Sequence, residues 1–151
     1  MKVFIIGIGL IGGSMALDIK SIYDNATILG IDANEKHLDE ALNLGIIDQK
    51  ANENDLINAD LVIVSVPVDV ALVILPDILD KIGEQTLVFD VGSTKHPICE
   101  SVQNHLKRKN FMACHPIAGT EFSGPKAAIK GLFKGKTNII CEVESARSAT
   151  S

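Results

Sequence analysis

Two short runs in this 151-residue sequence combine residue types and spacings that can do chemistry. The run GIGLIG at 7–12 has the spacing G-x-G-x-x-G, and the run CHPIAGTEFSG at 114–124 places a histidine directly before a proline. A glycine-rich turn can bring backbone amides close to a phosphate, and a histidine can take up a proton near neutral pH. Together they suggest a bound nucleotide and a reaction that moves a proton.

The glycine run has the sequence context that a dinucleotide site requires. It follows a predicted strand at Val3–Ile6 and opens a predicted helix at Leu10–Ile22. In this arrangement Gly7 permits a tight turn, Gly9 lets a pyrophosphate approach the backbone, and Gly12 lets the helix pack on the strand. The N-terminus of the helix then offers free N–H groups to the phosphates.

A carboxylate stands where such a site needs one. Asp32 follows the predicted strand Thr27–Ile31, 20 residues after Gly12. It can accept hydrogen bonds from both ribose hydroxyls and would repel a 2′-phosphate, and no arginine follows in the run DANEK, so we predict NAD rather than NADP. The simpler alternative is a glycine-rich turn beside a surface aspartate. The predicted cofactor contacts are Gly7, Gly9, Leu10, Ile11, Gly12, Asp32, Val66 and Pro67.

Hydride chemistry also needs a proton acceptor, and the sequence has four histidines. His37 and His105 fall within predicted helices, on faces expected to meet solvent, and His96 precedes a helix proline. His115 alone lies at a strand end, in a predicted loop beside the expected cofactor edge, and Pro116 favours an extended backbone there. We predict His115 as the base; a histidine with a purely structural role stays the alternative.

Three polar residues near these strand ends have both functional and structural interpretations. Ser93, in the run DVGSTK, follows another predicted strand, and its hydroxyl can hold the histidine, touch a substrate, or cap the next helix. Thr120 and Glu121 can contact a substrate or be ordinary turn residues.

Strands alternating with helices must position these residues. We expect further strands at 61–66, 86–89, 111–114 and 137–143, and helices at 35–44, 69–82 and 95–106. Pro76 can kink or split the second of these helices. This order predicts an α/β fold: a Rossmann-type doubly wound, mainly parallel sheet with helices on both faces. Ligands bind such sheets at the carboxyl ends of the strands. Residues 1–143 form the predicted dinucleotide-binding domain, and 144–151 a polar tail expected to be disordered.

Composition fits this fold and narrows the function. Hydrophobic residues make up 46% of the chain and aromatic residues 4%, so the core must be aliphatic, as in buried parallel sheets. The net charge of −5 argues against a nucleic-acid partner. Residues 101–151 are nevertheless basic, which suggests either a solvated surface or an anionic small ligand. Three cysteines without metal-like spacing suggest reduced thiols in the cytoplasm, and no segment has the length of a membrane span.

The runs GIGLIGGS, DVGSTK and HPIAGTEFSG, in this order between residue 3 and about residue 126, resemble prephenate dehydrogenase. The third run is the distinctive one, because many dehydrogenases share the glycine turn. The resemblance implies that His115 is the catalytic histidine that accepts a hydrogen bond from the ring hydroxyl of the substrate. It also implies that Ser93 orients this histidine and that Thr120 and Glu121 lie beside the substrate.

The implied reaction is the NAD-dependent oxidative decarboxylation of prephenate to 4-hydroxyphenylpyruvate, a step of tyrosine biosynthesis. Arogenate is an equally compatible substrate. Family members continue into a helical domain that forms a homodimer and supplies an arginine to the substrate, whereas this chain stops at Ser151. We therefore expect the chain to bind NAD but to turn over poorly or not at all by itself.

Two other functions stay open from the sequence. Another NAD(P) oxidoreductase, such as a hydroxyacid dehydrogenase or an imine reductase, would need a catalytic lysine or aspartate in a following domain. A non-catalytic NAD-binding regulatory module would keep the glycine turn and Asp32 but would leave His115 idle.

Overall fold

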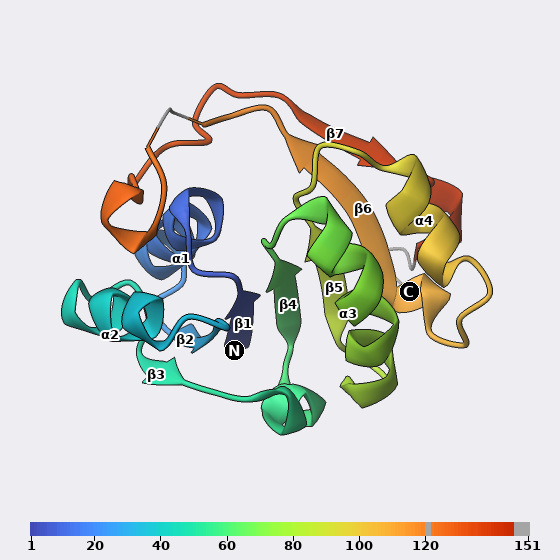
Figure 1. Cartoon of the computed structure of the whole chain (residues 1–151), viewed down its shortest axis with the longest axis horizontal. Helices are drawn as coiled ribbons and strands as arrows, with labels where there is room; N and C mark the ends of the chain where they lie inside the picture. Colours follow the sequence, from blue (N-terminus) through green and yellow to red (C-terminus); the bar gives the residue numbers. More distant parts are fainter. Residues whose placement is uncertain (120–121, 147–151) are drawn as a thin grey trace.

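The computed structural model describes residues 1–119 and 122–146, and these form one twisted sheet covered by helices (Figure 1). The seven strands have the order β3-β2-β1-β4-β5-β6-β7, in which every neighbouring pair is parallel except β6 and β7. The strands are β1 (Lys2–Ile6), β2 (Thr27–Ile31), β3 (Gln49–Lys50), β4 (Leu61–Val64), β5 (Leu87–Asp90), β6 (Phe111–Pro116) and β7 (Asn138–Cys141), and the helices are α1 (Leu10–Ile22), α2 (Glu35–Asn43), α3 (Val68–Lys81) and α4 (His96–Val102). Short 3₁₀ turns occur at η1 (Glu53–Asn58), η2 (Arg108–Asn110), η3 (Pro125–Ala127) and η4 (Val143–Ser145). The predicted fold class is confirmed.

Both faces of the sheet are buried, which explains the run of β-branched residues in its strands. Along β1, Val3 and Ile5 pack into an aliphatic cluster with α1 and α2. Phe4 and Ile6, which point to the other face, pack into a second cluster with α3 and α4. This alternation follows from the two-residue period of a strand and produces three layers, helix, sheet and helix.

The strand order reverses between β1 and β4, and this is the feature of the fold that positions a site. The chain leaves β1 toward β2 and β3 on one side and returns to β4, β5 and β6 on the other. The connections at the carboxyl ends of β1 and β4 therefore diverge and leave a crevice between them.

Helix α4 is shorter than predicted. It ends at Val102 and not near Leu106, which is 96% exposed. His105 follows the helix, and its ring Nδ1 accepts a hydrogen bond from the backbone N–H of Lys107 at 3.0 Å. A side chain that binds the backbone locally competes with helical hydrogen bonds, so the helix stops. The predicted helical position of His105 was wrong for this reason.

Strand β6 is longer than predicted, and α3 is not split. The expected strand ended at Cys114, whereas β6 continues to Pro116 because β7 pairs with it in the antiparallel direction and opposes His115 with Ile139. Helix α3 runs from Val68 to Lys81 with Pro76 inside it.

The segment after β6 turns back over the first helices, which the sequence did not indicate. The backbone N–H of Ile129 donates to the buried hydroxyl of Ser14 at 2.9 Å, and that of Gly131 donates to Asp18 Oδ1 at 2.7 Å. In Figure 1 this orange segment lies beside α1 and α2. Hydrogen bonds across more than 110 residues of sequence thus attach it to the N-terminal half of the domain.

Candidate active site

The glycine-rich turn adopts a conformation that explains two of its three glycines sterically. Gly7 has φ +91°, and a Cβ there would lie 2.2 Å from the carbonyl oxygen of Ser65. A Cβ on Gly12 would lie 2.3 Å from the carbonyl oxygen of Gly7, so α1 could not approach the turn. Gly9 is different, because a Cβ there would meet nothing within 4 Å. A side chain at position 9 would occupy this open space. Because glycine leaves it empty, a phosphate group can enter it.

The N-terminus of α1 is free to face a ligand. Gly9 is the N-cap of this 13-residue helix, and no side chain caps it. The first turn also contains no acidic residue. Its amides and the positive end of the helix dipole are therefore available to an anion in the crevice.

Asp32 lies at the end of β2 with its carboxylate directed to the turn. Its Oδ2 accepts a hydrogen bond from the backbone N–H of Ile8 at 2.8 Å, and its Oδ1 accepts one from Asn34 at 2.8 Å. The imidazole Nδ1 of His37 lies 3.7 Å from the same Oδ2. These bonds fix the carboxylate, and its unused lone pairs can still accept the hydroxyls of a ribose.

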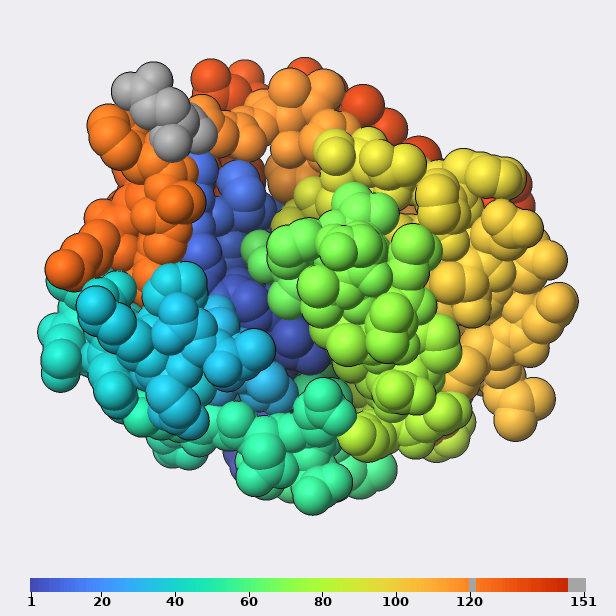
Figure 2. Space-filling model, in the orientation of Figure 1, coloured from blue at the N-terminus to red at the C-terminus, as the bar shows by residue number. Residues whose placement is uncertain are grey.

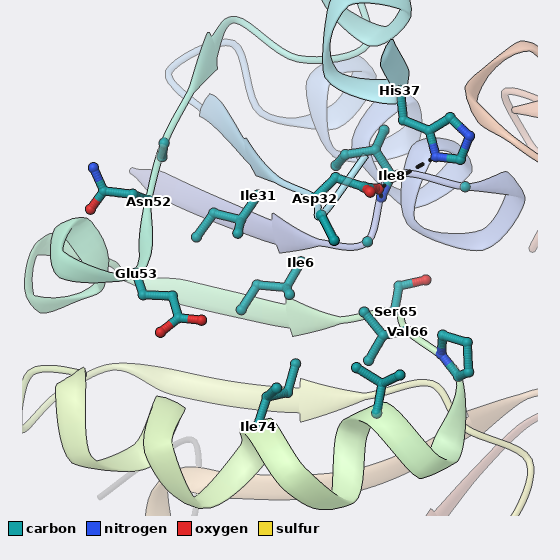
Figure 3. A pocket seen from close by; sticks show the side chains of 16 residues that line it. Ile6, Ile8, Ile31, Asp32, His37, Asn52, Glu53, Ser65, Val66 and Ile74 are labelled. Carbon is teal, nitrogen blue, oxygen red and sulfur yellow. Dashed lines mark hydrogen bonds and ion pairs between the residues drawn. The ribbon is translucent and has the colours of Figure 1, made fainter. Parts of the chain in front are cut away.

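A pocket of about 640 Å³ occupies this crevice. Figure 3 shows Asp32 and His37 on one side and Val66 and Ile74 on the other. In the space-filling view, the blue residues of the first strand and turn are visible between α2 in cyan and α3 in green (Figure 2). The lining residues are Ile6, Gly7, Ile8, Gly9, Ile31, Asp32, Ala33, His37, Ala51, Asn52, Glu53, Ser65, Val66, Pro67, Val70 and Ile74.

The pocket is lined by some of the predicted cofactor contacts and by residues that were not predicted. Gly7, Gly9, Asp32, Val66 and Pro67 line it, whereas Leu10, Ile11 and Gly12 do not. The pocket also contains His37, which the sequence predicts on a solvent-facing side of its helix. A usable signal existed, since the first turn of a helix that starts just after Asp32 must border the same edge.

His115 and Ser93 lie at the same edge of the sheet, outside this pocket. His115 is the fifth residue of β6 and not a loop residue as predicted; its ring Nδ1 is buried and has no hydrogen-bond partner among the described residues. Ser93 is exposed in the connection from β5 to α4. It does not cap that helix, whose N-cap is Lys95. Thr120 and Glu121 lie outside the described residues.

A buried ion pair holds the base of this second region. Asp90, at the end of β5, is almost completely buried and pairs with Lys95, which is itself largely buried. The ammonium of Lys95 also donates to the carbonyl of Cys114 at 2.6 Å. Burial raises the pKa of the Cys114 thiol to about 11, so the thiol is protonated and a poor nucleophile at neutral pH.

Part of the basic C-terminal region has structural partners. Arg108 is buried, donates to the carbonyl of Phe111 at 2.9 Å and forms an ion pair with Glu142 at 2.7 Å. Lys107 donates to the carbonyl of Ile82 at 2.6 Å. These two cations hold α3, β6 and β7 together and are not available to an anionic ligand.

Residues 1–119 and 122–146 contain no cluster of three or more His, Cys, Asp or Glu side chains arranged to hold a metal ion. The same residues form no helix that is both long and apolar enough to cross a membrane.

Comparison with known proteins agrees with this geometry. Residues 15–150 match the family model described as prephenate dehydrogenase, nucleotide-binding domain. This chain belongs to the prephenate dehydrogenase family. The match begins after the glycine turn, so the family assignment does not depend on a motif shared with other dehydrogenases.

Relatives in this family cover most of the chain. Prephenate dehydrogenase of Bacillus subtilis (strain 168) is 37% identical over 142 residues, which are 91% of this chain and 38% of the relative. The structure of prephenate dehydrogenase from A. aeolicus in complex with hydroxyphenyl propionate and NAD+ has a TM-score of 0.84 and 30% identity, covering 97% of this chain and 52% of that one. Synechocystis arogenate dehydrogenase has a TM-score of 0.83 and 25% identity, covering 93% and 49%. The chain thus spans about half the length of these proteins, or less.

Proposed function

We propose that this chain is the NAD-binding part of a dehydrogenase that converts prephenate to 4-hydroxyphenylpyruvate by oxidative decarboxylation. The observation that carries the proposal is that the glycine turn, Asp32 and His115 lie at one edge of the sheet. A nucleotide site and a histidine that can accept a proton thereby lie at the same edge of the fold.

The residues of the crevice fit NAD. The open space at Gly9 admits a pyrophosphate, the uncapped N-terminus of α1 faces it, and Asp32 presents a carboxylate to the adenosine ribose. A 2′-phosphate at Asp32 would be repelled by its charge, which favours NAD over NADP. The A. aeolicus relative is described in complex with NAD+, which supports the same choice. When bound, NAD accepts the hydride from C4 of the substrate ring.

His115 accepts the proton of the C4 hydroxyl during the reaction and afterwards returns it. As the C4 hydrogen leaves as hydride, the C4 hydroxyl becomes acidic, and its proton passes to the imidazole. The ring carboxylate departs as carbon dioxide, and its bonding electrons complete the aromatic ring. The protonated imidazole then returns the proton to the phenolate oxygen of the product. Ser93, on the neighbouring connection, holds the ring hydroxyl of the substrate in line for this transfer.

Prephenate is proposed over arogenate on the strength of similarity. The Bacillus subtilis relative, 37% identical, is named a prephenate dehydrogenase, while the arogenate dehydrogenase of Synechocystis is 25% identical. Since prephenate carries a keto acid side chain and arogenate an amino acid side chain, steady-state rates with both substrates separate the two.

Replacement of His115 by asparagine tests the proposal. Asparagine keeps a polar side chain but takes up no proton, so kcat of the full-length protein that contains this chain should fall by roughly 10²–10⁴-fold. The Kd for NAD should change less than about twofold, because His115 lies outside the nucleotide pocket. The measurements are prephenate-dependent NADH formation and calorimetric titration of NAD, the latter repeated with 4-hydroxyphenylpyruvate present.

The matched control is His105→Asn, which replaces a histidine that pairs with Asp80 away from the crevice. It should leave kcat unchanged. An unchanged rate in the His115 variant would refute the assigned base. No prephenate-dependent rate in the unsubstituted full-length protein would favour a regulatory NAD-binding module.

A further inference from the structure

The ion pair between Asp90 and Lys95 is buried, and a contribution to stability alone does not explain its presence. The two side chains are 1% and 12% exposed. The free energy needed to remove two charges from water offsets much of their attraction, so a buried ion pair is weak evidence for stability. The pair also spans the connection that contains Ser93. Its location, between strand β6, which carries His115, and the connection that carries Ser93, suggests a role in positioning.

The contacts of the pair converge on one residue, Cys114, which immediately precedes His115. Asp90 Oδ1 accepts the backbone N–H of Cys114 at 3.2 Å, and the ammonium of Lys95 donates to the carbonyl oxygen of Cys114 at 2.6 Å. The other carboxylate oxygen, Oδ2, accepts the N–H of Gly92 at 3.0 Å. Both backbone polar groups of Cys114 are thus held by charged side chains.

The Asp90 and Lys95 side chains bind the backbone of β6 just beyond the point where the pairing of β5 with β6 ends. The pairing of β5 with β6 ends at Asp90 opposite Ala113, so the β5 backbone has no further register with Cys114 or His115. On the opposite side, β7 pairs with His115 through Ile139. The Asp90–Lys95 pair therefore supplies the β5-side constraint at the position where the backbone must present the imidazole.

The imidazole has little else to orient it. Its buried Nδ1 has no hydrogen-bond partner within the described part of the chain. In the absence of such a tether, the direction of the ring depends on the backbone of β6 and on packing. A small backbone displacement at Cys114 would then move the ring relative to the substrate hydroxyl, and proton transfer is sensitive to such displacements.

We propose that Asp90 and Lys95 are positioning residues that fix the backbone of Cys114 and so direct His115 toward the reacting hydroxyl. The same pair closes the connection that carries Ser93, which keeps both side chains at one edge. This inference rests on the proposed function, in which His115 is the base. It assigns no contact between Lys95 and the substrate.

The variants that test this are Lys95→Met, Asp90→Asn and the double variant. Each single variant should lower kcat of the full-length protein by roughly 10- to 100-fold, the scale expected of a displacement of about 1 Å. KM for prephenate and Kd for NAD should change less than about threefold. The double variant leaves no uncompensated charge, so it should recover thermal stability without recovering kcat.

Lys107→Met is the matched control. Lys107 is also a partly buried lysine bound to a backbone carbonyl, that of Ile82, but it lies before the N-terminal end of β6. Its replacement should lower thermal stability and leave kcat unchanged. If Lys107→Met lowers kcat as much as Lys95→Met, the loss reflects general destabilisation and the proposal is wrong.

Amide hydrogen exchange and the imidazole ¹⁵N signals provide a readout independent of turnover. In Lys95→Met, exchange at the Cys114 amide should accelerate at least tenfold, and the His115 ring signals should shift or broaden; Lys107→Met should show neither change. A large rise in KM with intact kcat would instead make Lys95 a substrate ligand and overturn the proposal. If His115→Asn abolishes turnover while the pair variants keep kcat, only this inference fails; if His115→Asn keeps its rate, the proposed function fails first.

Discussion

At the scale of single residues, the three glycines of the turn have separable roles. Gly7 and Gly12 are required by the fold, because a Cβ at either would lie less than 2.5 Å from a backbone oxygen. Gly9 is not required by the fold, since it has ordinary backbone angles, φ −110° and ψ −151°, and open space around it. Its absence of a side chain matters only when a ligand occupies the crevice.

Alanine at Gly9 should therefore separate binding from stability. We expect Gly9→Ala to keep its Tm within about 2 °C, because a substitution without a clash or strain costs little. Its affinity for NAD should fall at least tenfold, since the new methyl group occupies the space proposed for the pyrophosphate. Gly7→Ala, the control, should lose stability by more than about 1–2 kcal/mol from its left-handed conformation alone. Thermal unfolding and calorimetric titration measure both quantities; full NAD affinity in Gly9→Ala would contradict the placement of the phosphate.

At the scale of elements, one carboxylate joins the first helix to the second strand. Asp48 accepts the backbone N–H of Ile28 and the ammonium of Lys20, both at 2.8 Å, and Lys20 also donates to the carbonyl of Gly45 at 2.9 Å. Burial by itself would raise the pKa of Asp48, but the bonds from Ile28 and Lys20 outweigh it and hold this pKa below its usual value. The carboxylate thus links α1, β2 and the connection into β3 in its charged form.

The hydrogen bonds of the Asp48 carboxylate should make the free energy of unfolding depend on pH. Because the pKa of Asp48 is lower in the folded chain than in the unfolded chain, its contribution is present above about pH 4 and is lost as pH falls further. A partly exposed pair of this kind contributes about 0.2–1 kcal/mol, so Asp48→Asn should lower Tm at pH 7 by at most roughly 4 °C. The difference in Tm between this variant and the unsubstituted chain should be smaller at pH 3. Scanning calorimetry at both pH values measures it, and an equal gap at the two pH values would contradict the assignment.

At the scale of the whole molecule, the crevice is shared by the two halves of the sheet. Its lining comes from β1, β2 and α2 on one side and from the end of β4 and α3 on the other. Residues of both aliphatic clusters line it, with Ile6 and Ile74 from one cluster and Ile8 from the other. A ligand in the crevice contacts both halves, so its binding should stabilise the domain as a unit.

NAD should therefore raise the unfolding temperature more than NADP. At 100 times its Kd, a ligand that binds only the folded state adds about 2.7 kcal/mol, which corresponds to roughly 5–10 °C for a domain of this size. NADP at the same concentration should give a much smaller shift because its 2′-phosphate meets Asp32. Asp32→Ala should reduce the difference between the two cofactors. Equal shifts with NAD and NADP in the unsubstituted chain would rule out the role assigned to Asp32.

The sequence by itself determined the fold and the nucleotide end of the site. Strand Thr27–Ile31 and helix Leu10–Ile22 have the predicted bounds, and Gly7, Gly9 and Asp32 line the pocket as expected. These features depend on local properties: hydrophobic period, the conformational freedom of glycine, and a carboxylate placed directly after a strand. Such properties act over a few neighbouring residues, so they are readable from the chain.

Only the tertiary structure decided which distant residues meet. It joined the hydroxyl of Ser14 to the backbone of Ile129 and directed the Asp90–Lys95 pair onto Cys114. It also paired β7 with β6 and thereby extended β6 beyond His115. These contacts depend on which strands are neighbours in the sheet and on where their pairing ends, and both result from the packing of the whole domain and not from any local pattern.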